Sequence, residues 1–324
     1  MASPAAAAGR IPILILGSGA LATLFAARLA AGGMPVTLLG GWPEGLAALR
    51  RHGARLVGED GRELAFPVQV AERPQACAPA SHALVLVKAW QTDEAARRLS
   101  VCLRPDGLAV SLQNGLGNRQ RLAAALGSER VGLGVTTLGA TLLGPGRVRP
   151  GGEGPVWLER HPRLGPLAAA LQESGFEVRL VEDAEALVWG KLVINAAINP
   201  LTALLGIPNG ELLNRPAARR QMAALAVEAA AVAAALGISL PFADPVAAAE
   251  QVARQTAANH SSMLQDVRRG APTEIDSICG EIVRLGERLG IPTPLNRRMW
   301  RQIRALTGRS VTKAGRAVPP HPQT

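Results

Sequence analysis

The chain contains no tyrosine, and aromatic residues make up only 3% of its 324 residues. Alanine, leucine, valine and glycine must therefore fill the interior, which suits closely packed helices and parallel strands. Hydrophobic residues make up 48% and charged residues 19%, so the composition supports buried cores and excludes general disorder. A chain of this length fits one large domain or two ordinary ones.

Cysteine is scarce as well, and the spacing of Cys77, Cys102 and Cys279 fits neither a disulfide framework nor a metal site. We therefore expect a reducing, cytoplasmic setting and no bound metal. Residues 1–10 are alanine-rich without the pattern of a secretory signal, and no uninterrupted apolar run reaches membrane length. We expect no membrane partner, and flexible termini at residues 1–10 and 310–324.

Long basic runs are also missing, although the formal net charge is +10. The arginines occur in ones and twos with almost no aromatic residues between them, which disfavours a base-stacking nucleic-acid surface. A solvated arginine-rich surface is the simpler interpretation, and its positive field suits anionic ligands. Only the net charge favours DNA binding, and no motif supports it. We therefore expect no nucleic-acid partner.

Apolar segments alternate with helical or turn-rich ones in the first half of the chain. The expected strands are Ile11–Leu16, Pro35–Leu39, His82–Val87 and Leu108–Leu112. The segment that follows the first strand is expected to form a helix that runs to about Ala31. This alternation predicts βαβ units and a parallel sheet. Glycine-rich short strands between Val131 and Leu158 are expected to add to that sheet in antiparallel orientation.

Helical periodicity takes over after about Glu182, and the breaks carry glycine or proline. The expected helices are Leu187–Leu205, Ala217–Leu236, Pro245–Arg268, Glu274–Leu289 and Leu295–Leu306. The sequence thus predicts an α/β fold class, with an N-terminal Rossmann-type parallel-sheet domain at residues 11–182. An all-helical, substrate-binding C-terminal domain is expected at residues 183–309.

A glycine-rich segment follows the first expected strand and opens a helix, which is the context of a dinucleotide-binding loop. Its residues are Gly17, Ser18, Gly19, Ala20, Leu21 and Ala22. Gly17 permits a tight turn, Gly19 lets the backbone approach a pyrophosphate, and the helix N-terminus offers N–H groups to the phosphates. A mere tight turn is the alternative, and the position in the βαβ series favours a dinucleotide.

The end of the second strand should distinguish NAD from NADP, because an acidic residue there binds the ribose 2′-OH. The chain reads Leu38-Leu39-Gly40-Gly41-Trp42, with neither an acid nor an arginine. The missing acid disfavours NAD. Arg50 and Arg51 lie one helix later and are either phosphate ligands or surface charges.

Lysine is the rarest cation of the chain, with only Lys88, Lys191 and Lys313 among 35 basic residues. An ammonium can lose its proton, whereas a guanidinium effectively cannot. Lys191 lies in an apolar helical stretch, with Asn195 and Asn199 at i+4 and i+8 on the same side. These three polar residues on one side of an apolar helix indicate a binding surface. The alternatives are that the stem of Lys191 packs on the protein while its charge stays in water, and that the two amides form hydrogen bonds between helices.

Seven separated motifs between Ile11 and about Arg304 carry a resemblance to a known family. They are Gly17-Ser-Gly-Ala-Leu, Val87-Lys-Ala-Trp-Gln, Gln113-Asn-Gly, Trp189-Gly-Lys with Asn195 and Asn199-Pro-Leu-Thr-Ala, Pro208-Asn-Gly-Glu-Leu, Ser261-Ser-Met-Leu-Gln-Asp and Thr273-Glu-Ile-Asp. With them the chain resembles the ketopantoate reductases (2-dehydropantoate 2-reductases), the NADPH-dependent enzymes of pantothenate synthesis.

The resemblance implies a role for each matching residue. Lys191 would donate a proton to the carbonyl oxygen of a small-molecule 2-keto acid. The residues implied to hold the substrate are Asn114, Asn195, Asn199, Asn209 and Ser262, and those implied to line the NADPH site are Lys88, Asn114, Ala140 and Glu274. The family usually has an arginine after the second strand, where this chain has Gly41.

Two further functions stay open beside pantoate formation. The same scaffold can reduce another branched 2-keto acid, or it can bind a nucleotide without turnover; Lys191, Asn195, Asn199 and Glu274 argue against the second. His260 is a possible acid, but a lone histidine at a helical position is more often structural. A monomer and a homodimer both fit the sequence.

Overall fold

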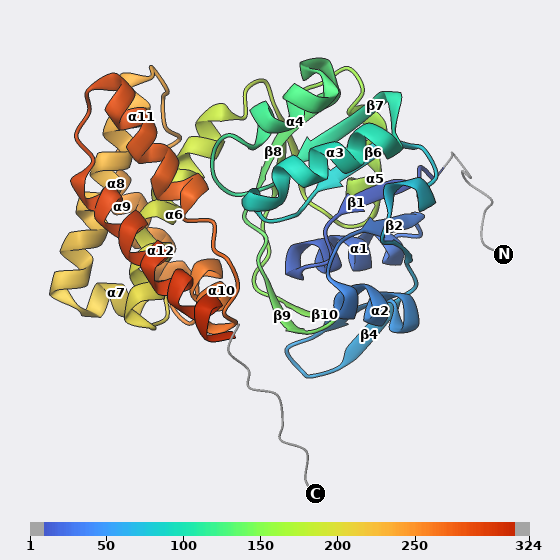
Figure 1. Ribbon diagram of the computed structural model, residues 1–324, viewed down its shortest axis with the longest axis horizontal. Helices are drawn as coiled ribbons and strands as arrows, with labels where there is room; N and C mark the ends of the chain where they lie inside the picture. The colour runs from blue at the N-terminus through green and yellow to red at the C-terminus, as the bar shows by residue number, and fades with distance from the viewer. Residues whose placement is uncertain (1–9, 315–324) are drawn as a thin grey trace, which may run out of the picture. The chain divides into compact units, whose positions relative to one another are not determined.

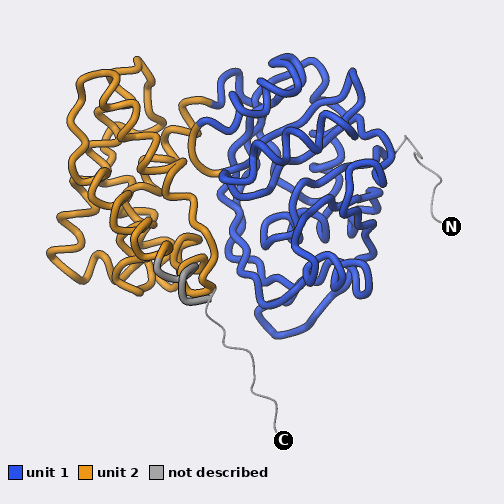
Figure 2. Tube along the Cα trace, in the orientation of Figure 1, with its two compact units in different colours: residues 1–113, 117–184 blue, residues 114–116, 185–324 orange. Residues whose placement is uncertain are grey.

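The computed structural model describes the backbone of residues 10–314 and the side chains of residues 10–308. The chain divides into two compact units. Unit 1 contains the described residues up to Gln113 together with Gly117–Ala184, and unit 2 contains Asn114–Leu116 and the residues from Glu185 onward (Figure 2). The predicted order, an α/β domain followed by a helical one, is confirmed.

Unit 1 is built on an eight-stranded sheet in the order β12-β11-β8-β7-β6-β1-β2-β5. The strands are β1 (Ile13–Leu16), β2 (Val36–Leu39), β5 (Gln69–Ala71), β6 (Ala80–Val85), β7 (Leu103–Ser111), β8 (Val131–Thr136), β11 (Val156–Glu159) and β12 (Val178–Val181). From β5 to β8 every neighbouring pair is parallel. Strand β11 is antiparallel to β8, and β12 is parallel to β11.

Helices cover both faces of this sheet. The helices of unit 1 are α1 (Ala20–Ala31), α2 (Pro43–His52), α3 (Thr92–Cys102), α4 (Asn118–Leu126) and α5 (Gly165–Glu173), with short 3-10 turns η1 (Pro74–Ala76), η2 (Ala89–Gln91) and η3 (Ser128–Arg130). Ile13 and Ile15 pack in the cluster that contains α1 and α5, whereas Leu14 and Leu16 pack in the cluster with α3 and α4 (Figure 1). Because both faces of the sheet are buried at β1, this strand is a continuous apolar run.

A second sheet corrects one sequence prediction. Strands β3 (Ala54–Val57), β4 (Glu63–Phe66), β9 (Ala140–Gly144) and β10 (Arg147–Pro150) pair in the order β4-β3-β10-β9. The segment from Val131 to Leu158 was expected to extend the first sheet in antiparallel orientation, but only β11 does so. Hairpin β9–β10 pairs with β3 instead, where Glu63 accepts hydrogen bonds from Arg55 (3.2 Å) and Arg147 (2.6 Å).

Unit 2 is helical and is built around α6. Its helices are α6 (Glu185–Leu205), α7 (Glu211–Asn214), α8 (Pro216–Ala235), α9 (Pro245–Gln255), α10 (Ser262–Arg268), α11 (Glu281–Leu289) and α12 (Pro294–Ala314), with a π-helical turn η4 (Asp276–Gly280). Helix α6 is long and apolar enough to cross a membrane, but 67% of its apolar window is buried inside the protein. Trp189 and its apolar neighbours form the core of unit 2, so α6 is a core helix.

Two predicted helix boundaries are wrong. The expected helix Pro245–Arg268 is interrupted between α9 and α10, because the carbonyls of Ala257 and Asn259 accept hydrogen bonds from the backbone N–H groups of Gly210 and Asn209. Helix α12 continues to Ala314, beyond the expected end at Leu306 and into the segment expected to be flexible from residue 310. The rest of both predicted flexible termini, apart from Arg10, lies outside the described residues.

Glu228 of α8 caps the first turn of α12. Its carboxylate accepts hydrogen bonds from the backbone N–H groups of Leu295 (2.8 Å) and Asn296 (2.9 Å) and from the Asn296 side-chain amide (2.9 Å). Asn296 is fully buried, so its amide has no access to water as an alternative acceptor. A single carboxylate thus joins two helices that are distant in the sequence.

Replacing Glu228 by Ala should lower the free energy of unfolding by about 3 kcal/mol, because the buried amide and the first-turn N–H groups lose a charged acceptor. Urea unfolding followed by circular dichroism measures this loss. Val227→Ala is the matched control on the same helix, because Val227 is 51% exposed. An equal loss in both variants would contradict the capping role.

Candidate functional site

The glycine-rich loop after β1 has a backbone that only glycine adopts easily at its first position. Gly17 has a φ of +125°, and its N–H group donates to the carbonyl of Leu39 over 2.8 Å. A Cβ atom on Gly17 would lie 3.1 Å from the carbonyl oxygen of Leu86. The loop is thereby held against the ends of β2 and β6, at the carboxyl edge of the sheet where ligands bind in such folds.

The N-terminus of α1 is open to an anionic ligand. Gly19 is its N-cap, with no side-chain cap and no acidic residue in the first turn. The first intrahelical bond runs from Thr23 N–H to the Gly19 carbonyl, so the N–H groups of the preceding turn have no acceptor within the helix. A Cβ atom on Gly19 would meet no described atom within 4 Å. These features fit the pyrophosphate of a dinucleotide.

Ser18 links this loop to the end of β2. It is buried, and its hydroxyl oxygen lies 2.8 Å from the position that a Cβ atom would take on Gly40. A larger residue at position 40 would therefore push the loop away. Gly40 is buried, whereas the next residue, Gly41, is exposed.

Lys88 and Ala140 also lie in unit 1. Strand β6 ends at Val85, two residues before the expected end at Val87. Lys88 therefore lies beyond the strand and directly precedes the turn η2, where its N–H donates to the side chain of Gln91 over 3.3 Å. Gln113 donates to the carbonyl of Val87 over 3.1 Å and joins the segments after β6 and β7. Ala140 begins β9 and packs against the cluster that contains α1.

In unit 2, α6 presents Lys191, Asn195 and Asn199 along one side, as the spacing predicts. Lys191 and Asn195 are partly exposed, whereas Asn199 is buried. Helix α6 continues through Pro200 to Leu205. The proline has no N–H group to donate to the carbonyl one turn before it.

Asn114 belongs with this helix and not with the sheet that precedes it. Its side-chain amide donates to the carboxylate of the buried Glu274 over 3.1 Å, and the N–H of Leu116 donates to the carbonyl of Ser277 over 3.0 Å. Gly115 has a φ of +82°, and a Cβ atom on it would lie 2.5 Å from the Ser277 carbonyl oxygen. The Asn-Gly pair therefore forms a turn that presents Asn114 to Glu274.

Lys191 is electrostatically tuned. Burial of its ammonium lowers the pKa of Lys191 to about 8, and the negative charge of Glu274 opposes that shift without cancelling it. The residue keeps partial exposure while the protein around its charged end displaces most of the water. An ammonium with such a pKa holds its proton at neutral pH and can release it to a developing alkoxide.

Asn209 and Ser262 come from other segments of unit 2. Asn209 precedes α7 and donates to the hydroxyl of Thr256 over 2.9 Å, while its buried side-chain oxygen accepts no hydrogen bond from any described residue. Ser262 is partly exposed and begins α10. The neighbouring Ser261 is buried, and its hydroxyl lies 2.7 Å from that of Thr202 on α6.

Sequence reasoning missed the roles of Ser261 and Thr202. Ser261 caps α10 by accepting a hydrogen bond from Leu264 N–H over 3.1 Å, and its contact with Thr202 fastens α10 to the helix that carries Lys191. A serine before an apolar helical run is a recognisable capping signal, but its partner on α6 lies 59 residues away. His260 is exposed and lies between α9 and α10, so it does not occupy the helical position that the sequence predicted.

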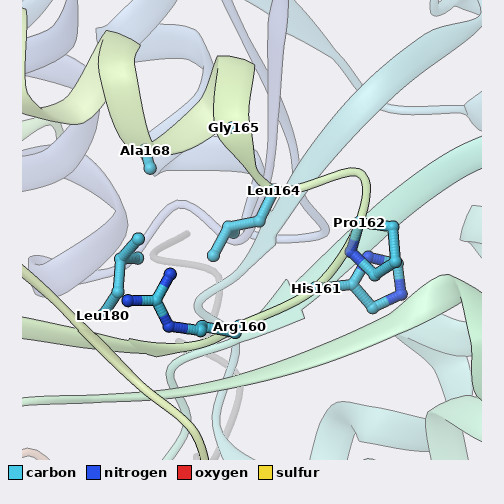
Figure 3. A pocket seen from close by; sticks show the side chains of 7 residues that line it. All are labelled: Arg160, His161, Pro162, Leu164, Gly165, Ala168 and Leu180. Carbon is cyan, nitrogen blue, oxygen red and sulfur yellow. The ribbon is translucent and has the colours of Figure 1, made fainter.

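A pocket elsewhere in unit 1 holds none of the predicted site residues. It has a volume of roughly 390 Å³ and lies between the loop after β11 and helix α5 (Figure 3). Its polar groups are already engaged: Arg160 pairs with Glu182 over 2.6 Å, and both ring nitrogens of His161 contact backbone atoms. Across residues 10–308, no group of three or more His, Cys, Asp or Glu side chains is arranged to hold a metal ion.

The sequence is similar to known proteins over nearly its whole length. The family description Ketopantoate reductase PanE/ApbA matches residues 13–163, and Ketopantoate reductase PanE/ApbA C terminal matches residues 183–307. The 2-dehydropantoate 2-reductase of Halobacterium salinarum is 36% identical over 298 residues, which cover 90% of this chain and 97% of that protein. That of Archaeoglobus fulgidus is 36% identical over 299 residues, covering 91% and 97%.

Solved structures agree in fold. A PanE/ApbA family ketopantoate reductase from Ralstonia eutropha superposes with a TM-score of 0.86 at 31% identity, covering 93% of this chain and all of that one (100%). D-mandelate dehydrogenase with NADH and anilino(oxo)acetate also superposes with a TM-score of 0.86, at 26% identity, covering 93% and 99%. The similar proteins therefore include enzymes that are named for two different substrates and share one fold.

Proposed function

The chain belongs to the ketopantoate reductase family, and from that premise we propose that it reduces 2-dehydropantoate to pantoate with NADPH. The family binds a nicotinamide dinucleotide, and the open N-terminus of α1 fits its pyrophosphate. The observation that carries the proposal is Lys191, a lysine with a pKa of about 8 beside the buried Glu274, on a helix side with two amides.

The loop residues Gly17, Ser18 and Gly19 and the first turn of α1 would hold the dinucleotide. When bound, the nicotinamide supplies the hydride that adds to the C2 ketone. Lys191 donates a proton from Nζ to the carbonyl oxygen, so hydride and proton together convert the ketone to the alcohol. Before transfer, the ammonium stabilises the negative charge that develops on that oxygen.

Glu274 has two tasks in this proposal. Its charge keeps the pKa of Lys191 from falling further, which maintains the protonated form at neutral pH. Its carboxylate also accepts the hydrogen bond from Asn114 and so orients that amide. Asn195, Asn199, Asn209 and Ser262 are proposed to hold the carboxylate and hydroxyl of the substrate; the free side-chain oxygen of Asn209 is an acceptor for a hydroxyl.

A panel of 2-keto acids assayed with NADPH and with NADH tests the proposal. We expect the highest kcat/KM for 2-dehydropantoate with NADPH. A second candidate, a reductase of another 2-keto acid, is favoured by the likeness to D-mandelate dehydrogenase, so the panel includes phenylglyoxylate, the keto acid that corresponds to mandelate. Fast turnover of another acid beside slow turnover of 2-dehydropantoate would replace the first candidate by the second. Cofactor binding without any turnover would indicate a non-catalytic paralogue.

The pH profile follows from the pKa of Lys191. Reduction needs the protonated amine, so kcat/KM should be flat below about pH 8 and fall above it by roughly tenfold per pH unit. The reverse oxidation needs the free amine and should show the opposite limb. Initial rates in buffers of constant ionic strength from pH 6 to about 10 measure both profiles.

Glu274→Gln should move this alkaline limb to lower pH, because the carboxylate raises the pKa of Lys191. Glu281→Gln is the matched control, since Glu281 pairs with Arg284 on α11 and should leave the profile in place. A limb that stays at the same pH in the Glu274 variant would assign it to another group.

A further inference from the structure

No arginine follows β2 in the sequence, yet the structure brings one to that place from a distant helix. Arg98 of α3 donates from Nη1 to the carbonyl of Gly40 over 2.9 Å. Its Nη2 lies 3.7 Å from the position that a Cβ atom would take on Gly41. The guanidinium therefore faces the residue at which a side chain following β2 would begin.

The positive charge of Arg98 is not fully neutralised by the carboxylate that it binds. Arg98 donates from Nε to Glu94 over 2.8 Å, and Arg97 binds the same carboxylate over 2.8 Å. Two guanidinium groups thus share one carboxylate, which leaves this cluster with a net positive charge. Within the described residues, the Nη2 atom of Arg98 makes no hydrogen bond. The side chain of Arg98 is 24% exposed and that of Arg97 is 68% exposed, so only Arg98 is held in place by the fold.

The same surface adjoins the dinucleotide loop. The Ser18 hydroxyl of the loop lies 2.8 Å from the position of an added Cβ on Gly40, and the carbonyl of Gly40 accepts the hydrogen bond from Arg98. In dinucleotide-binding folds, the ribose next to the adenine reaches the end of the second strand, where an acid binds a 2′-OH or an arginine accommodates a 2′-phosphate. No acid occupies this place here, and the planar donor fork of a guanidinium suits a phosphate.

The two arginines considered from the sequence are placed less well. Gly41 lies directly before the N-cap of α2, whereas Arg50 and Arg51 lie in the last turn of that helix. A rise of about 1.5 Å per residue puts them roughly 10 Å further along the axis. Arg50 is also paired with Glu72 over 3.0 Å.

We propose that Arg98 binds the 2′-phosphate of NADPH and sets the preference of this protein for NADPH over NADH. The assignment rests on the proposed function only in that a nicotinamide dinucleotide binds the loop after β1. Gly41 leaves the space through which the guanidinium reaches the phosphate.

Direct binding of NADPH and NADH to the full-length protein, followed by the fluorescence of the reduced nicotinamide, tests this proposal without turnover. Arg98→Ala should raise the Kd for NADPH by about ten- to a hundredfold, because a charged hydrogen-bond donor is lost, and change the Kd for NADH by less than about threefold. Arg98→Lys should recover part of the NADPH affinity, since it keeps the charge without the fork. Arg97→Ala is the matched control in the same cluster and should change neither Kd.

Adenosine 2′,5′-bisphosphate and AMP serve as fragment competitors against the bound cofactor. The bisphosphate should compete better than AMP in the wild type and lose that advantage in Arg98→Ala. Gly41→Asp should reverse the preference toward NADH, since position 41 has room for a side chain and the acid would pair with Arg98 and repel the phosphate.

An equal loss of NADPH and NADH affinity in Arg98→Ala would overturn the proposal and assign Arg98 to holding the loop. Unchanged Kd values for both cofactors would overturn it as well. Those results leave 2-keto acid reduction untouched. Conversely, absence of turnover with every keto acid, together with the expected shift in Kd ratio, would remove the proposed function and keep the assignment of Arg98.

Discussion

Replacing Lys191 by Ala should lower kcat for the reduction by about a hundred- to ten-thousandfold, the usual contribution of a positioned acid that also stabilises the developing charge. The Kd for NADPH should stay within about twofold, because Lys191 lies on α6 of unit 2 and the predicted phosphate site lies in unit 1. Steady-state kinetics at pH 7 and cofactor binding by fluorescence measure the two quantities.

Two further substitutions separate the roles of this lysine. Lys191→Arg keeps a positive charge that cannot be given up as a proton, so it should remain nearly as slow as the alanine variant. Lys191→Met removes the charge at similar length and should not lower Tm. The folded-state pKa of about 8 lies below the usual value, so the buried ammonium opposes folding at every pH below 8. Wild-type turnover in any of the three would refute the proton-donor assignment.

The second large effect is expected at Gly19. Gly19→Val should raise the Kd for NADPH and NADH alike by about a hundred- to ten-thousandfold, because a side chain there displaces the pyrophosphate from two or more charge-assisted hydrogen bonds at the start of α1. The fold should be little affected, with a loss of less than about 1 kcal/mol. Gly19 has a φ of −83°, and an added Cβ meets no described atom within 4 Å.

Two other glycines provide the controls. Gly308 lies in α12 and also has open space around an added Cβ, so Gly308→Val should leave both cofactor affinity and Tm nearly unchanged. Gly17→Val should lower Tm as well as affinity, because position 17 has a φ of +125° and close contacts with Leu86. Normal cofactor binding in Gly19→Val, measured by the same fluorescence titration, would place the phosphates elsewhere.

Much of the fold was predictable from local patterns. The buried strand β1, the glycine loop and α1 form one continuous segment, so their order and spacing carry the signal. Lys191, Asn195 and Asn199 lie on one helix, where a periodicity of 3.6 residues is enough to align them. Their proposed roles as proton donor and substrate ligands remain predictions.

Contacts between distant segments were not predictable. Hairpin β9–β10 pairs with β3 and does not join the main sheet. The expected helix Pro245–Arg268 is interrupted where two of its carbonyls accept hydrogen bonds from the segment before α7. In both cases the competing hydrogen bonds come from segments far away in the sequence. Local propensity does not contain that information, and tertiary pairing overrides it.

The sequence by itself determined the glycine-rich loop after β1, the helix stripe with Lys191 and the absence of a charged residue at position 41, because each depends on neighbouring residues or on one helical period. Only the tertiary structure decided what surrounds them. It buried the ammonium of Lys191 near Glu274, 83 residues further along the chain, and lowered its pKa to about 8. It also brought Arg98 beside Gly41, because α3 packs on the sheet face next to the end of β2. Charge, burial and distance between remote side chains are properties of packing, and packing sets both the acid and the cation of the proposed site.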